Sequence, residues 1–560
     1  MPHYSGSATV TASASGYISS AIAATSGSAT VSTLGELQSG ASVAAGGYAD
    51  VTAMGNLAGN VTGASVSAAS YNGNVTGNIT ATTGAATVHA AGELQDTITA
   101  ATAANATAGG TVNVTMNSSG SVSLAALGTA GDTATAAITA DGQVMVSSYG
   151  VLNITASDSS AVYGMSITGM NAVTAQIGQG TANVGSVSIV AGGQLQGSVS
   201  TTGGSESLLS AGAMSMALTA NTGPDQDITA TALGGLTGSD ITASGLVSVL
   251  IGGVGGGSGA ADSIAGGQGV SLTAGGSFEG SLASASGTIS AIIGTDAALT
   301  SVTAGQDVTL IALGHITTGS GTNAVYAGQT LQIAAGGYLA GNFGSGGNAQ
   351  LAALGSATPS VNAVGNIVIS SLGVLTPVAT AGGDIQLISY GGIGTATSGA
   401  TATAGHDITQ MMSTGPIYGT FIGDHAIGSV QGFDLIDASF TAGTSQGTQD
   451  STYGILQSVQ AWGAISGSVT ASAAIDNVIG GTAIPATLTA PHIGTLIGYE
   501  TGIFGYTPPT PQVSLAAAQA ALAQLANAVS QVQAQAAAAN SSMAAAIAAN
   551  QAGLAQTVTL

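Results

Sequence analysis

The chain lacks basic residues: its 560 residues include no Lys and no Arg, and 23 acidic residues give a formal charge of −23 at pH 7. About a tenth of an average chain is Lys or Arg, so their complete absence at this length is not chance. Nucleic-acid binding requires Lys and Arg to neutralise phosphates, and anionic lipid surfaces attract the same side chains. We therefore expect neither nucleic acid nor an anionic membrane surface as a partner.

Cysteine is also absent, which excludes a disulfide framework. Aromatic and charged residues each make up only 4% of the chain, whereas hydrophobic residues make up 45%. This balance is the opposite of the low hydropathy and high charge of disordered chains, so we expect the chain to fold. No uninterrupted run of about 18 apolar residues occurs, and we expect no membrane span.

Small residues dominate what is present: 89 Gly accompany abundant Ala, Ser, Thr and Val, a composition typical of thin strands and tight turns. Between residues 267 and 410, a short apolar alternation follows a Gly-containing turn again and again. This pattern indicates one solenoid coil per repeat. The first inward residues of these repeats recur at steps of about 18 to 23 positions, at Val270, Ile289, Val308, Leu331, Ala349, Ile367, Ile385 and Ile408.

Within each repeat the apolar residues alternate with a period of two, as in Val308 and Leu310, which sends alternate side chains to one face of a strand. A second apolar set follows the turn, for example Leu375 with Val378, so each coil should hold two or three short strands. Helical solenoids are the competing architecture, but Gly-rich units of about 20 residues are too short for helix pairs. The fold predicted is all-β, a parallel β-helix solenoid over residues 1–415 with coils of about 20 residues.

Two of these units, AGQDVTLIALGHITTG (Ala304–Gly319) and AGQTLQIAAGGYLAGN (Ala327–Asn342), resemble the repeats of filamentous-haemagglutinin-type secreted proteins. Those proteins are large bacterial surface adhesins exported by two-partner secretion, and the resemblance extends over most of residues 1–415. It implies a right-handed β-helix, an extracellular or cell-surface location and a role in adhesion. The chain departs from the family in lacking a recognisable N-terminal secretion domain and in having no Lys or Arg.

Residues 416–506 have a looser pattern and denser aromatic residues, including the single tryptophan, Trp462. Strand-like phrases persist, so we interpret this region as a continuing or capping β region. A solenoid needs an atypical end to cover its open core, and Trp462, Phe421 and Phe433 suit such a cap. The alternative is that these aromatic side chains form an exposed platform that binds a sugar ligand.

Residues 507–512 read Thr-Pro-Pro-Thr-Pro-Gln, an extended linker. Residues 513–560 then become rich in Ala, Gln and Leu, which predicts an amphipathic α-helix with apolar residues at heptad spacing. We expect this helix to dock on a protein surface or to form a coiled coil, and thus to serve oligomerisation. Its candidate assembly residues are Leu515, Leu522, Leu525, Val529, Val532 and Met543.

Several repeats place Asp directly before a strand, and Asp384 and Asp407 are expected at the same corner of adjacent coils. Without Lys or Arg, only a metal ion, a proton or a hydrogen bond can compensate two neighbouring carboxylates. Calcium is the metal that carboxylate and carbonyl oxygens favour. An Asx turn that accepts backbone N–H groups is the plainer alternative. The six His residues show no paired ligand spacing, so the sequence predicts no His-based metal site and no other cofactor.

No catalytic constellation is recognisable, and we expect no enzymatic activity. The leading hypothesis is an extracellular structural protein: a β-helical subunit of a bacterial surface fibre, filament, sheath or matrix that assembles with itself through solenoid ends or the C-terminal helix. The alternative is an adhesin or phage-type tail fibre that binds a glycan, receptor or cell surface through residues 416–506.

Overall fold

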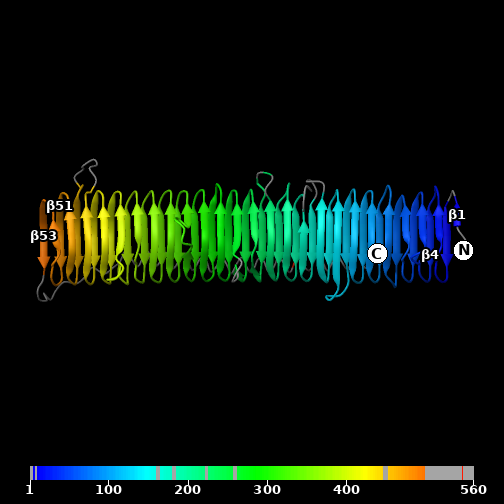
Figure 1. Cartoon of the computed structure of the whole chain (residues 1–560), viewed down its shortest axis with the longest axis horizontal. Helices are drawn as coiled ribbons and strands as arrows, with labels where there is room; N and C mark the ends of the chain where they lie inside the picture. Colours follow the sequence, from blue (N-terminus) through cyan, green and yellow to red (C-terminus); the bar gives the residue numbers. More distant parts are fainter. Residues whose placement is uncertain are drawn as a thin grey trace. The chain divides into compact units, whose positions relative to one another are not determined.

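The computed structural model describes residues 4–6, 9–158, 164–178, 184–220, 223, 225–256, 261–444, 452–498 and 545. The described coils belong to two compact units that divide between Gly252 and Gly253. Each unit is an all-β parallel solenoid, and the coils number about 24 in total, with about 19 residues each. In each unit the strands of successive coils lie side by side (Figure 1).

Every coil contributes strands to two parallel sheets, here called sheet A and sheet B, which enclose the interior between them. In the first unit, sheet A contains β1 (Tyr4–Gly6), β3 (Ala21–Ala24), β5 (Ser42–Ala45), β7 (Asn60–Gly63), β9 (Val75–Ala81), β11 (Leu94–Ala100), β13 (Val112–Ser118), β15 (Thr133–Ala140), β17 (Val151–Asp158), β19 (Val173–Ile177), β21 (Leu195–Thr201), β23 (Ala213–Ala220), β25 (Gly235–Leu236) and β26 (Asp240–Ala243). Sheet B of the same unit contains β2 (Val10–Ala14), β4 (Ala29–Thr33), β6 (Tyr48–Ala53), β8 (Ser65–Ser70), β10 (Ala86–Ala90), β12 (Ala103–Ala108), β14 (Ser121–Ala126), β16 (Val144–Ser148), β18 (Met165–Gly169), β20 (Val187–Ala191), β22 (Glu206–Ser210), β24 (Ile228–Ala232) and β27 (Leu246–Ile251).

The second unit repeats this arrangement. Its sheet A contains β28 (Val254–Gly255), β29 (Asp262–Gly266), β31 (Phe278–Ser284), β33 (Ala297–Ala304), β35 (Ile316–Thr318), β36 (Val325–Ala327), β38 (Leu339–Ser345), β40 (Ala357–Ala363), β42 (Val378–Ala381), β44 (Ala400–Ala404), β46 (Ile417–Gly423), β48 (Ile436–Ala442), β50 (Ile465–Ala471) and β52 (Thr487–Thr489). Its sheet B contains β30 (Gly269–Ala274), β32 (Thr288–Ile293), β34 (Val308–Ala312), β37 (Leu331–Ala335), β39 (Ala349–Ala353), β41 (Ile367–Ser371), β43 (Ile385–Ser389), β45 (Asp407–Ser413), β47 (Ala426–Gly432), β49 (Ile455–Ala461), β51 (Ala474–Gly480) and β53 (His492–Gly498).

The coils stack in register, and this confirms the repeat predicted from sequence. The eight residues from Val270 to Ile408 named as first inward positions pair one to the next along sheet B. All eight are buried, so they form one continuous apolar ladder on the inner face. Parallel strands lie about 4.8 Å apart, so each of these side chains packs directly on its equivalent in the next coil.

Serine hydroxyls close the inner corner where sheet B strands end. Ser371 Oγ donates to the Gly355 carbonyl at 2.7 Å, and Ser389 Oγ donates to the Gly373 carbonyl at 2.8 Å. Both serines are buried, and a buried carbonyl left without a donor would cost about 1–3 kcal/mol. The repeated pairing of an inward Ser with a turn Gly explains why both residue types are abundant.

Glycines in a turn and in a strand let successive coils approach closely. A Cβ on Gly336 would lie 2.0 Å from the Leu313 carbonyl oxygen of the preceding coil. At Gly419, with φ +146°, an added Cβ would lie 2.1 Å from the Ala400 carbonyl oxygen. No side chain fits either position without moving the backbone apart, so Gly is required there by the coil spacing and, at Gly419, also by its φ angle.

Residues 416–444 and 452–498 contain further coils of the same kind, because β46 to β53 pair in the same two sheets. Phe421 in β46 lies over Phe440 in β48, with ring centroids 5.4 Å apart and planes 20° apart. Both rings are fully buried. Phe421 is therefore an interior residue of the solenoid, with no surface to offer a ligand.

The apolar set expected after the turn in the coil of β42 is only partly buried. Leu375 and Val378 were named together as an apolar set after the turn, but only Leu375 is buried; Val378 points outward, and Ala379 is buried beside it. Leu375 forms only an isolated bridge, and Pro377 separates it from β42, so the alternation does not continue between them.

The Pro-rich linker at 507–512 and the helix at 513–560 lie outside the described residues, apart from Ala545. Among the described residues, no helix has the length and apolar character needed to cross a membrane.

We predict that Phe440→Ala will destabilise the second unit by about 3–5 kcal/mol, because it removes a buried ring and leaves a cavity against Phe421. Urea unfolding followed by circular dichroism measures the loss. Phe433→Ala is the matched control, since Phe433 is only half-buried at a turn, and its loss should be clearly smaller. Equal losses for the two variants would contradict the interior role of the Phe421–Phe440 pair.

Candidate functional site

Sheet B strands of the second unit begin at a corner where polar side chains bind the next coil. We call the position directly before the first inward residue of each sheet B strand the B corner. Side-chain oxygens of Asp307, Asn348, Asn366 and Asp384 each accept the N–H of the equivalent residue one coil on, at 2.8–3.2 Å. The Asp residues predicted directly before strands thus act largely as acceptors for backbone N–H groups. The N–H group belongs to the next coil, whereas in an Asx turn it would belong to the same turn.

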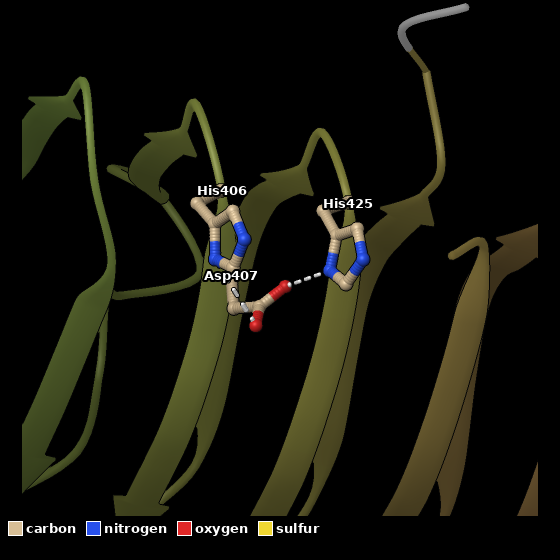
Figure 2. Close-up of side chains that lie close together, drawn as sticks. All are labelled: His406, Asp407 and His425. Atoms are coloured by element: carbon tan, nitrogen blue, oxygen red, sulfur yellow. Dashed lines mark hydrogen bonds and ion pairs between the residues drawn. The ribbon is translucent and has the colours of Figure 1, made fainter. Parts of the chain in front are cut away.

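Two histidines join this corner at the starts of β45 and β47. The His425 Nδ1 atom lies 2.7 Å from Asp407 Oδ1. The His406 Nδ1 atom lies 3.3 Å from Asp407 Oδ2 and 3.0 Å from Asp384 Oδ1. Figure 2 shows both imidazoles directed toward the Asp407 carboxylate from neighbouring strands. Because a carboxylate only accepts, His425 Nδ1 donates to Asp407 and His406 Nδ1 donates to Asp384.

The two imidazoles stack on each other, with centroids 4.6 Å apart and planes 8° apart. Their stacking follows from the in-register pairing of Asp407 with Ala426, which places His406 and His425 at equivalent positions of adjacent coils. Tyr453 lies edge-on to the His425 ring, at a centroid distance of 5.9 Å. The side chain of His425 is 14% exposed, whereas that of His406 is 57% exposed. The cluster is thus open to solvent on the His406 side and closed on the other.

His406, Asp407 and His425 can present one ligand atom each, all within 4.8 Å of one another. Sequence reasoning identified Asp384 and Asp407 but expected no histidine ligands. The structure places His406 between those two carboxylates, as the distances above show. The missed signal is the 19-residue step from His406 to His425, which equals one coil length. Comparing titratable residues at coil spacing, rather than at helical ligand spacing, reveals the pair.

The other candidate residues lie apart from this cluster or outside the described residues. Phe433 and Trp462 are neighbours at the turns that follow β47 and β49, with ring centroids 5.8 Å apart. Trp462 is exposed, so this pair forms a small aromatic surface at the opposite ends of the sheet B strands from the histidines. The assembly residues Leu515, Leu522, Leu525, Val529, Val532 and Met543 lie outside the described residues.

Two acids of the first unit occupy inward positions that the repeat pattern reserves for apolar residues. Asp96 lies between Gly77 and Val114 in sheet A, and Glu206 lies between Val187 and Ile228 in sheet B.

Burial raises the pKa of Asp96 from 3.8 to about 7, although the Thr97 N–H donates to it. Burial likewise raises the pKa of Glu206 from 4.5 to about 8, opposed mainly by a hydrogen bond from Thr201. No described group hydrogen-bonds to Asp96 Oδ2 or to Glu206 Oε2. Inside the solenoid the protonated, neutral form of both carboxyls is therefore the more stable one.

We predict that the first unit loses stability as pH rises from about 4 to 8, because these acids bind their protons more tightly when folded than when unfolded. The stabilisation is complete below the unfolded pKa values and disappears as pH passes the folded ones. Each carboxyl contributes a slope of about 1.4 kcal/mol per pH unit between its two pKa values.

Urea unfolding at several pH values measures this slope. Asp96→Asn and Glu206→Gln should each flatten it, whereas Asp240→Asn, at an exposed position, should leave it unchanged. A slope that survives both substitutions would contradict the assignment to these two carboxyls.

Comparisons with protein-family models, curated proteins and solved structures find no match to this chain.

Proposed function

We propose that this chain is an extracellular structural protein without enzymatic activity, a subunit that builds a bacterial surface fibre, filament, sheath or matrix by association with copies of itself. Its solenoid is proposed to be right-handed and of the filamentous-haemagglutinin type, as the repeat resemblance implies. The observation that carries the proposal is the last described strand, β53: no described strand continues the ladder beyond it, and it exposes apolar side chains.

β53 pairs with β51 along one edge, and no described strand pairs with its other edge. Its apolar side chains are uncovered: Leu496 is 54% exposed, whereas its register partner Val478 in β51 is fully buried. An open strand edge is a template for pairing with a further strand. A second copy of the chain can supply that strand, and such a head-to-tail contact does not close on itself, so it propagates into a filament.

The charge of the chain favours this mode of contact. Identical subunits that carry only acidic groups repel one another, and no Lys or Arg is available to form an ion pair across an interface. Contacts must then rely on backbone pairing, apolar burial, bound cations or low pH, and of these the first two need nothing beyond the chain itself. The β53 edge suits both, since no described strand pairs with its outer side and Ile493 and Leu496 are exposed.

We predict that Leu496→Asp will abolish assembly, because it adds an uncompensated negative charge at the centre of the apolar edge. Negative-stain electron microscopy and sedimentation velocity measure filament length and mass. Val364→Asp is the matched control, since Val364 is 70% exposed at a turn away from β53. Filaments of normal length from the Leu496→Asp variant would rule out the β53 contact.

Residues 513–560 supply the second proposed contact, a helix that docks on a neighbouring subunit. Deletion of residues 511–560 should stop assembly if this helix joins the subunits. Filaments of normal length from the deleted chain would exclude the helix as the linker and leave the β53 edge as the interface.

The second candidate function is an adhesin or phage-type tail fibre that binds a glycan or receptor through residues 416–506. The observation in its favour is the surface pair of Phe433 and Trp462, because sugars stack on exposed aromatic rings. A discrete oligomer in solution, together with quenching of Trp462 fluorescence by an oligosaccharide, would favour this candidate. Open-ended polymers favour the structural protein.

A further inference from the structure

We propose that His406, Asp407 and His425 form a binding site for a divalent transition-metal ion such as Zn²⁺, with the ion joining two successive coils of the second unit. The ligands are the Nδ1 atoms of the two imidazoles and a carboxylate oxygen of Asp407, and water completes the coordination. This site is independent of the proposed filament contact, since it lies at the starts of β45 and β47 rather than at β53.

The donor atoms suit such an ion. Zn²⁺ binds imidazole nitrogen at about 2.0–2.1 Å and carboxylate oxygen at about 2.0–2.2 Å, which places ligand atoms of one site roughly 3.3 Å apart. One ligand atom from each residue lies within 4.8 Å of the others. His425 Nδ1 lies 2.7 Å from Asp407 Oδ1, and His406 Nδ1 lies 3.3 Å from Asp407 Oδ2. The two rings are nearly parallel, so they must tilt toward each other before both in-plane Nδ1 lone pairs can point at one ion.

Binding exchanges protons for metal. His425 Nδ1–H donates a hydrogen bond to Asp407, and His406 Nδ1–H donates one to Asp384, as described above. An ion bound at Nδ1 requires that nitrogen to be unprotonated, so its proton moves to Nε2 of the same neutral ring or leaves to solvent from an imidazolium. Affinity should therefore fall as pH falls, because protons compete for the imidazole nitrogens.

The mixed donor set selects against calcium. Ca²⁺ takes six to eight oxygen ligands and has little affinity for nitrogen, whereas imidazole favours Zn²⁺, Cu²⁺, Ni²⁺ and Co²⁺. One face of the site is closed by Tyr453 beside the largely covered His425, and the exposed His406 leaves a path for the ion. The calcium considered for Asp384 and Asp407 is thus replaced by a softer ion once the histidines are placed.

The test is metal binding by the full chain. Equilibrium dialysis against Zn²⁺, in 150 mM salt with excess Mg²⁺ to occupy non-specific acidic positions, is followed by elemental analysis of the bound metal. We expect one Zn²⁺ per chain with micromolar or tighter affinity at pH 7.5, and affinity at least tenfold weaker at pH 5.5. Co²⁺ should give the intense visible absorption of a four-coordinate nitrogen and oxygen site.

Single substitutions locate the ion. His425→Gln and Asp407→Asn should each weaken Zn²⁺ binding at least 30-fold and abolish the Co²⁺ absorption, while circular dichroism confirms that the solenoid is intact. His89→Gln is the matched control, because His89 lies on β10 of the first unit, beside Tyr71, and binding by this variant should equal that of the unchanged chain.

Two results would overturn the inference. The first is no specific Zn²⁺ or Co²⁺ binding by the unchanged chain, or binding that survives His425→Gln. The second is Ca²⁺ binding that competes equally with Zn²⁺ and is lost in Asp407→Asn but retained in His425→Gln, which would assign a carboxylate calcium site instead. Loss of filaments in the Leu496→Asp variant does not bear on this site, so the two proposals fail separately.

Discussion

Register between coils is the constraint on which the rest of this structure depends. Each coil pairs through its backbone with the coil before it, so residues one coil apart lie directly over one another. A side chain in this solenoid therefore has its sequence equivalent as its nearest neighbour, about 4.8 Å away. Each side chain therefore lies between two others, the equivalent side chains of the preceding and the following coil.

This like-on-like stacking accounts for the composition. Apolar residues stack well on themselves, and the interior is a set of Val, Ile, Leu and Ala ladders. Charged residues stack badly, because like charges at this distance repel and the interior offers no water to screen them. Polar positions are instead filled by groups that both donate and accept, such as the inward serines, or by Asn and Asp oxygens that accept the next coil's N–H.

The features that could be predicted from the sequence are those that recur once per coil. The ladder from Val270 to Ile408 could be predicted because hydrophobic alternation and coil length agree over eight successive repeats. Val378 was misplaced because Pro377 interrupts the strand, and alternation cannot be extended across such a break. The buried Asp96 and Glu206 escaped prediction for the opposite reason: they obey the strand period but contradict the residue type expected at an inward position.

The histidine cluster was predicted only in part. Its carboxylates were expected at one corner, and the structure places them there with His406 between them. The imidazoles were not expected, because ligand spacing was sought along a helix or a single loop, whereas a solenoid brings together residues one coil apart. Coil lengths vary from 18 to 23 residues in the predicted ladder, so only the observed register shows that His406 and His425 are equivalent positions.

A chain without Lys or Arg must neutralise its carboxylates by other means, and the described residues show three of them. Most acids at strand starts accept backbone N–H groups, as Asp307 and Asp384 do. Asp96 and Glu206 lie in the interior and favour the protonated form. Asp407 alone meets two imidazoles.

Imidazole is the only side chain in this composition that can carry a positive charge near neutral pH, and in its neutral form it also binds metal ions. Two of the six histidines lie at a single corner beside Asp407. Few other side chains of this chain could compensate the charge of a carboxylate. The positions equivalent to His406 in the two preceding coils are Gly383 and Gly365, which pair through the backbone from coil to coil without any side chain. The imidazoles add a chemistry that the fold does not require, and this argues that the cluster serves a ligand rather than the coil.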